Sequence, residues 1–195
     1  EDNMKNDVLA HEASLKLAKA NFYKKDFDWT LQQVKNLKQS SSLLIANDAV
    51  ELFLLVQDNS IEDSLRVALK AYAKADLQLY QKKNEEALQS FLTILEKHKG
   101  ESIEDETLLK IADIYYQKKD YLKALSYYQN ILDNHKEGIY IDEALFFSAE
   151  IYRKHLLDNE KAKPLYEKMV LEHPDSLYYT ESRKQYRTLR GDTTI

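Results

Sequence analysis

The 195-residue sequence predicts an all-α protein, a right-handed solenoid of about ten helices stacked as hairpins. Small residues recur in pairs twelve or thirteen residues apart, and successive pairs are offset by 37 or 38 residues: Ala75 and Ala87, Ala112 and Ala124, then Ala149 and Ala162. Self-similarity with a period of roughly 30 to 40 residues is typical of repeat proteins. Three glycines and two prolines are too few for a turn-rich β protein.

The composition predicts a packed core and argues against several functions. Hydrophobic residues make up 44% of the chain and charged residues 31%, which favours folding over disorder. The net charge of −5 argues against binding to phosphate backbones, so we expect no nucleic acid partner. The absence of cysteine excludes thiol catalysis, disulfides and cysteine-ligated zinc, and it fits a reducing or an oxidising compartment equally well.

No segment is predicted to insert into a membrane. The longest apolar stretch, residues 49–56, is short and contains Glu51, so we expect a buried amphipathic helix there. The sequence opens at Glu1 rather than at a methionine. We therefore expect a fragment or a mature product, in which missing targeting information is not evidence about compartment.

Residues 105–138 contain the clearest hairpin. Apolar residues at helical spacing predict a first helix, and Asp120 is placed as the N-cap of a second. Ala112 and Ala124 are small at the point where the two helices cross, which allows axes about 8–10 Å apart. Tyr128 then fills the space beside that contact.

This order of small and aromatic residues, closed by Pro174 in the last copy, resembles the tetratricopeptide repeat, a unit of about 34 residues. Aligning its small first-helix position on Ala75, Ala112 and Ala149 gives units at 68–101, 105–138 and 142–175. The chain departs from the family pattern at the usual tryptophan position, which holds Ala71, Leu108 and Leu145. The resemblance implies stacked hairpins that bind proteins without catalysis or a cofactor.

Less regular elements are expected at both ends. Ala18 and Thr30 indicate a degenerate unit at 11–44, followed by an extra helix at about 43–57. A capping helix at 176–189, rich in tyrosine, arginine and lysine, has the polar character of a solenoid end. Pro164 lies inside the last second helix, so we expect that helix to start late or to kink, and an extra residue near 156–157 also predicts irregularity.

The first helices of such hairpins line a concave groove in the family that the chain resembles. Its positions predict a partner-binding groove made of Tyr72, Asp76, Leu79, Tyr80, Leu109, Asp113, Tyr116, Gln117, Phe146, Glu150, Arg153 and Lys154. The acids recur every 37 residues, so stacking predicts an acidic row that favours an extended or helical peptide with basic and apolar anchors. The alternative is that the acids are solvated surface and the aromatics are core.

Three histidines also recur once per unit, at the ends of the second helices: His98, His135 and His173. Successive units are too far apart for these side chains to share a metal ion at bonds of about 2 Å, so we interpret them as helix C-terminal residues. No glycine-rich phosphate loop, Ser-His-Asp order or paired carboxylates stand out. We therefore predict no catalytic, metal or cofactor site.

A second resemblance bears on context. Residues 26–29, 44–49 and 186–192 are similar to the C-terminal region of longer repeat proteins exported by Bacteroidetes-type bacteria, some of which resemble outer-membrane assembly lipoproteins. This implies a periplasmic or cell-envelope location and a larger parent protein, while a cytoplasmic location stays open.

The function predicted is a non-catalytic protein–protein interaction module whose groove binds a peptide or partner segment. The alternative is a structural segment that self-associates or docks within a longer chain, which exposed apolar residues on the terminal units would favour. An enzyme is the third possibility, and it would need pKa-shifted carboxylates converging in a pocket.

Overall fold

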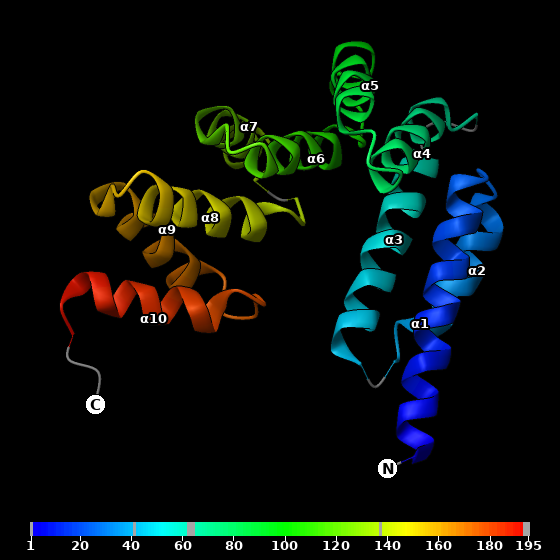
Figure 1. Cartoon of the computed structure of the whole chain (residues 1–195), viewed down its shortest axis with the longest axis horizontal. Helices are drawn as coiled ribbons and strands as arrows, with labels where there is room; N and C mark the ends of the chain where they lie inside the picture. Colours follow the sequence, from blue (N-terminus) through cyan, green and yellow to red (C-terminus); the bar gives the residue numbers. More distant parts are fainter. Residues whose placement is uncertain (1, 41, 62–64, 137, 193–195) are drawn as a thin grey trace. The chain divides into compact units, whose positions relative to one another are not determined.

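The computed structural model describes residues 2–40, 42–61, 65–136 and 138–192. These residues form ten α-helices and one π-helical turn, packed as sequential hairpins (Figure 1). The prediction of an all-α fold with about ten helices is confirmed. None of the described helices is both long enough and apolar enough to cross a membrane.

The chain folds as two compact units, residues 1–104 and 105–195. The first unit contains α1 (Asp2–Tyr23), α2 (Phe27–Leu37), α3 (Leu43–Ile61), α4 (Val67–Tyr80) and α5 (Asn84–Lys97). The second contains α6 (Glu104–Gln117), α7 (Tyr121–Asn134), α8 (Ile141–Glu150), the π-helical turn η1 (Ile151–His155), α9 (Asn159–Glu172) and α10 (Tyr179–Arg190). A single solenoid continuing through both units stays a prediction.

The turn inside each hairpin has one residue in the left-handed region. These residues are Lys25, Lys82, Lys119 and Leu157, with φ between 55° and 67°. In the turn after α6, the Lys119 N–H donates to the Tyr116 carbonyl and the Asp120 N–H donates to the Tyr115 carbonyl, each at 2.9 Å. This pair of bonds closes the end of the first helix and reverses the chain.

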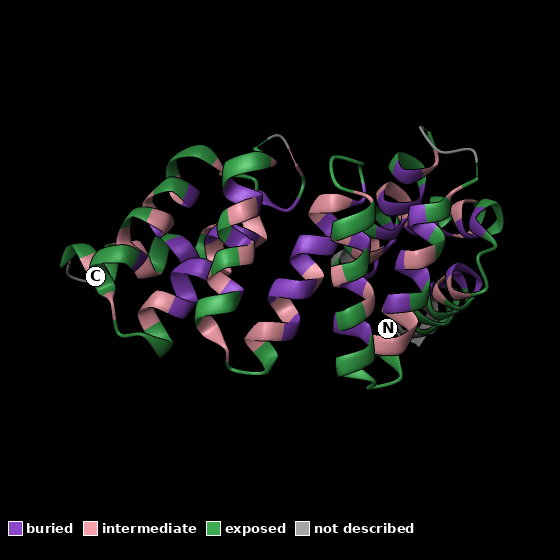
Figure 2. Ribbon diagram, turned by 90° about the horizontal axis from the view of Figure 1, so that it is seen from above, coloured by how far each residue is buried: buried purple, intermediate pink, exposed green. Residues whose placement is uncertain are grey.

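The small residues predicted from the repeat are all fully buried. Each has zero exposure: Ala75, Ala87, Ala112, Ala124, Ala149 and Ala162, together with the weaker pair Ala18 and Thr30. Large side chains, among them Tyr72, Tyr128 and Tyr166, fill the space beside these contacts. Within each unit the buried positions follow the sides on which the helices meet (Figure 2).

The irregular elements differ from expectation in detail. The extra helix α3 extends to Ile61, and the C-terminal helix begins at Tyr179. The last second helix, α9, begins at Asn159 and runs through Pro164, so it does not start late, and a kink at Pro164 stays a prediction. Its N-cap Asp158 accepts a 3.1 Å hydrogen bond from the Lys161 N–H, which fixes the start. The extra residue of this copy is accommodated in the wider turn of η1.

Candidate functional site

Six ring side chains of the second unit form a continuous series of contacts, from α6, the start of α7, α8, η1 and the residue before α10. We call them the aromatic row: Tyr121, His155, Tyr116, Phe147, Tyr178 and Phe146. Neighbouring ring centroids lie 4.0 to 6.0 Å apart along the row. His155 is exposed and the other five rings are partly exposed, so the row combines mutual packing with faces that a partner could contact.

One end of the row is organised by His155. Its imidazole stacks on the ring of Tyr121, with centroids 4.0 Å apart and planes inclined by 9°. The hydroxyl of Tyr116 lies 3.4 Å from His155 Nε2. His155 is the last residue of η1, so the wider helical turn places this imidazole against the end of the preceding hairpin.

Asp113 on α6 is linked to the row through Tyr128. The Tyr128 hydroxyl on α7 donates a 2.8 Å hydrogen bond to Asp113 Oδ1, and the Tyr128 ring stacks 6.2 Å from Phe147. Burial, followed by the negative charge of Asp113, raises the pKa of Tyr128 well above its usual value. Tyr128 therefore stays protonated and positions a half-buried carboxylate beside the row.

Glu150, at the end of α8, is enclosed by donors. The side chain of Glu150 is buried, and its carboxylate contacts Lys154 and the Tyr166 hydroxyl and accepts a 3.0 Å bond from Arg153. Burial alone would raise the pKa of Glu150, but hydrogen bonds from Lys154, Tyr166 and Arg153 outweigh it and lower that pKa. Glu150 is therefore an ionised acid held inside a network of its own unit.

In the first unit, the acid at the corresponding repeat position is Asp76, which contacts a tyrosine of another hairpin. Asp76 on α4 is half-buried, and its Oδ2 accepts a 3.0 Å hydrogen bond from the Tyr23 hydroxyl on α1. Tyr23 also packs against Tyr80, with ring centroids 5.9 Å apart. Asp76 therefore ties the fourth helix to the first.

The twelve predicted groove residues differ in exposure. Buried are Tyr72, Leu109 and Glu150; half-buried are Asp76, Leu79, Asp113, Tyr116, Phe146 and Arg153; exposed are Tyr80, Gln117 and Lys154. The first unit holds four of them and the second unit eight. An acidic row that includes Asp76 together with the acids of the second unit stays a prediction. Tyr72, Leu109 and Glu150 belong to the interior, with at most 6% of each residue exposed.

Comparison with known proteins identifies the second unit. Residues 106–137 and 143–176 match the family model of the tetratricopeptide repeat. These two hairpins are tetratricopeptide repeats. No curated protein matches the chain. Proteins built from such repeats are generally non-catalytic scaffolds.

The two tetratricopeptide repeats show what sequence reasoning missed. Four members of the aromatic row were absent from the predicted groove: Tyr121, Phe147, His155 and Tyr178. Phe147 stands 37 residues after Lys110, so the equivalent position of the preceding repeat gives no aromatic signal. His155 is the last residue of the π-helical turn η1, an irregularity that an alignment at a fixed offset of 37 residues does not capture.

The repeating histidines occupy the ends of the second helices, as predicted. His98, His135 and His173 are the C-cap residues of α5, α7 and α9. His173 Nδ1 lies 2.8 Å from Asp142 Oδ1, and His98 Nδ1 lies 2.9 Å from Glu101 Oε1. His98 and His173 therefore each link a helix end to a nearby acid.

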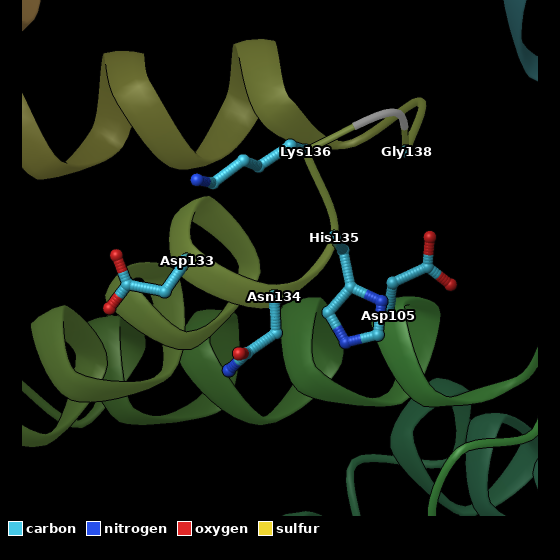
Figure 3. A pocket seen from close by; sticks show the side chains of 6 residues that line it. All are labelled: Asp105, Asp133, Asn134, His135, Lys136 and Gly138. Carbon is cyan, nitrogen blue, oxygen red and sulfur yellow. The ribbon is translucent and has the colours of Figure 1, made fainter.

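A shallow hollow follows α7, where the chain turns toward the next repeat. It is lined by Asp105, Asp133, Asn134, His135, Lys136 and Gly138 (Figure 3). The side chains of Asp133 and Lys136 extend to one side of the hollow and Asp105 lies at the other (Figure 3). The lining groups do not converge on one point, so we assign no ligand to the hollow.

Proposed function

We propose that the aromatic row and Asp113 form the surface on which the second unit binds an extended or helical segment of a partner protein. Tetratricopeptide repeats are protein–protein interaction modules, which supports a protein as the partner. The observation that carries the proposal is the row itself, because partly exposed rings in contact with one another offer apolar area at little cost in side-chain entropy.

The charges beside the row favour a basic anchor on the partner. Asp113 is half-buried and accepts a hydrogen bond from the Tyr128 hydroxyl. Glu150 is buried and contacts Arg153 and Lys154. A lysine or arginine of the partner would be attracted to the negative charge of Asp113, the less buried of the two acids, with apolar side chains against the rings.

The cellular context that we propose rests on sequence resemblance alone. Residues 26–29, 44–49 and 186–192 are similar to segments of exported repeat proteins, which supports a cell-envelope assembly role within a larger parent protein. Neither the repeat match nor the geometry of the second unit adds to that argument.

A second candidate function is self-association. The observation that favours it is the outer face of α1, where Leu9 is 62% exposed and Leu17 is 53% exposed. Exposed apolar side chains grouped on one helix indicate an interaction surface.

The groove proposal can be tested with peptides selected by display on the intact chain. The dissociation constant of each selected peptide would be measured by fluorescence anisotropy for the parent protein and for Asp113→Asn and Tyr116→Ala. Asparagine keeps an oxygen that can accept from Tyr128 while it removes the charge. We expect each change to weaken binding by about tenfold, the scale of one interface residue that contributes strongly.

The matched control is Gln129→Ala on α7, a second helix, where Gln129 is exposed and bonds only to Asp133 of its own helix among the contacts described. This change should leave peptide affinity unaltered. If Gln129→Ala weakens binding and the two site variants do not, the peptides bind the second helices and the proposal is wrong.

A further inference from the structure

The outer face of α1 has an apolar stripe that no described helix covers. Leu9, Ala13, Leu17 and Ala20 are all exposed and are spaced four, four and three residues apart. This spacing puts their side chains on one side of a helix. The core residues of α1, among them Ala18 and Phe22, lie on the opposite side.

The stripe contrasts with the outer surface of α10, the last helix of the chain that the structure describes. There the exposed positions are polar or charged: Thr180, Glu181, Arg183, Lys184, Arg187, Thr188 and Arg190. A helix that only closes a stack needs such a polar surface. The α1 stripe therefore does not have the character of a cap.

We propose that α1 pairs with α1 of a second copy of this chain in an antiparallel arrangement, with the two-fold axis beside Ala13. In that arrangement Ala13 faces its symmetry mate, and Leu9 of each copy faces Leu17 of the other. A small residue at the centre allows the helices to approach closely, and the leucines fill the space on both sides.

Charge complementarity identifies the second copy as the occupant. Glu12 and Lys16 flank the stripe on the same edge of α1, and Lys16 Nζ lies 2.7 Å from Glu12 Oε1. In an antiparallel two-fold pair the same edges meet, so Glu12 of each copy comes within about two residues, roughly 3 Å along the helix, of the level of Lys16 of the other, a gap that their side chains can span. The four groups then form a ring in which acids and bases alternate, whereas in a parallel two-fold pair opposite edges would meet and Glu12 and Lys16 would not face each other across the interface.

The size of the stripe sets the expected affinity. Leu9 to Ala20 spans about 18 Å of helix, which is less surface than the roughly 800 Å² per partner of a standard interface. We therefore expect a weak dimer, with a dissociation constant of tens to hundreds of micromolar. The inference concerns the self-association candidate and does not depend on the peptide-binding face of the second unit.

The first test is sedimentation equilibrium of the intact chain from about 5 to 500 µM, the range that brackets such an interface. The parent should shift from monomer to dimer, and Leu9→Lys with Leu17→Lys should remain monomeric with unchanged helix content by circular dichroism. Both leucines are exposed, so the fold does not need them. A parent that stays monomeric, or association that survives the double change, overturns the proposal.

The second test uses the charge ring. Glu12→Lys and Lys16→Glu should each weaken self-association by about tenfold, because each turns the ring into a set of like charges. An equimolar mixture of the two variants should dimerise as well as the parent, and so should the chain carrying both changes. Failure of the mixture and of the double variant to recover would show that these charges do not meet and would overturn the antiparallel arrangement.

The third test determines the relative orientation of the two α1 helices by disulfide cross-linking. The chain has no native cysteine, so only the introduced cysteines can react. Ala13→Cys should form a disulfide-linked dimer under mild oxidation. Leu9→Cys alone should not, but a mixture of Leu9→Cys and Leu17→Cys should give a mixed dimer. Efficient cross-linking of Leu9→Cys to itself would indicate a parallel pair or random collision and would contradict the proposal.

Discussion

The two tetratricopeptide repeats of the second unit share one frame but use the acid of their first helix differently. In the α6–α7 repeat, Asp113 is half-buried and accepts a hydrogen bond from Tyr128. In the α8–α9 repeat, Glu150 is buried and contacts Tyr166 at the corresponding place in the second helix together with two cations. The same repeat position is therefore half-buried in one copy and enclosed by donors in the next.

Two local differences produce this divergence. Gln117 of the first repeat is replaced by Lys154 in the second, 37 residues later, which supplies a cation one turn beyond the acid. The second repeat also has the π-helical turn η1, which begins directly after Glu150 and holds both Arg153 and Lys154. In this repeat, therefore, the turn that follows the first helix supplies two cations that pair with Glu150.

The largest expected effect on stability concerns a feature that both repeats share, a buried tyrosine in the second helix. Tyr128→Ala and Tyr166→Ala each remove a fully buried ring, so each should lower the free energy of unfolding by about 3–5 kcal/mol in urea titrations. Tyr166→Ala should be the more severe change because it also leaves Glu150 with one donor fewer. A loss below about 1 kcal/mol at either site would contradict the packing described here.

Replacing the cation that distinguishes the repeats should have a smaller effect. Lys154→Ala should destabilise the protein by about 1 kcal/mol at pH 7, because the half-exposed lysine pairs with a buried carboxylate. The matched change Gln117→Ala should be within about 0.5 kcal/mol of the parent.

The pH dependence of the destabilisation caused by Lys154→Ala provides a second measurement. Since the folded pKa of Glu150 is lowered, its stabilisation is present above the unfolded value of about 4.3 and is lost as pH falls through the folded pKa. The gap between Lys154→Ala and the parent should therefore narrow in acid. A gap that stays constant down to about pH 2 would show that the ion pair is not its cause.

The tyrosines should differ at alkaline pH. Burial, followed by the nearby carboxylate, raises the pKa of Tyr128, so its contribution is present below about pH 10 and is lost as pH rises toward the folded pKa. Tyr128→Phe should cost about 1 kcal/mol near pH 8, and this difference should shrink above about pH 10.

Tyr166→Phe provides the comparison for this alkaline effect. Arg153 beside the Tyr166 hydroxyl favours the ionised form and opposes the effect of burial and Glu150. The change with pH should therefore be smaller for Tyr166→Phe than for Tyr128→Phe. Equal alkaline profiles would contradict the different surroundings assigned to the two hydroxyls.

The smallest expected effect concerns the turns, where the repeats are alike. Lys119 and Leu157 have positive φ values of 61° and 55°, and Leu157 is 79% exposed, so neither position needs its side chain for packing. Glycine relieves the left-handed strain, and Lys119→Gly and Leu157→Gly should each raise the free energy of unfolding by roughly 0.5–1 kcal/mol. Destabilisation by either change would indicate a side-chain role that the turn geometry does not explain.

Much of the fold follows from the sequence because it depends on simple steric rules. Ala112 and Ala149 are small where helices cross, and Tyr128 and Tyr166 are large beside them, so spacing alone predicts the hairpins. Pro164 shows the limit of such rules, since the N-cap at Asp158 fixed the helix start despite the proline.

The candidate site was harder to predict because it depends on which polar groups meet. The pattern that repeats Asp113 and Glu150 every 37 residues gives no information on their tyrosine partners or on the cations beside Glu150. The row residue His155 became visible only once the π-helical turn fixed the register. The period of the sequence pattern predicts which positions are equivalent. It does not predict which side chains meet when an inserted residue changes the local helix geometry.

The measurement that tests the difference between the repeats most directly is the free energy of unfolding of Glu150→Gln and Asp113→Asn, determined side by side at pH 7. Both changes are nearly isosteric and remove one negative charge. We predict that Glu150→Gln loses about 2 kcal/mol, because a buried, multiply bonded carboxylate is replaced, and that Asp113→Asn loses less than about 0.5 kcal/mol. Equal losses, or a larger loss for Asp113→Asn, would contradict the assignment of Glu150 to internal structure and Asp113 to binding.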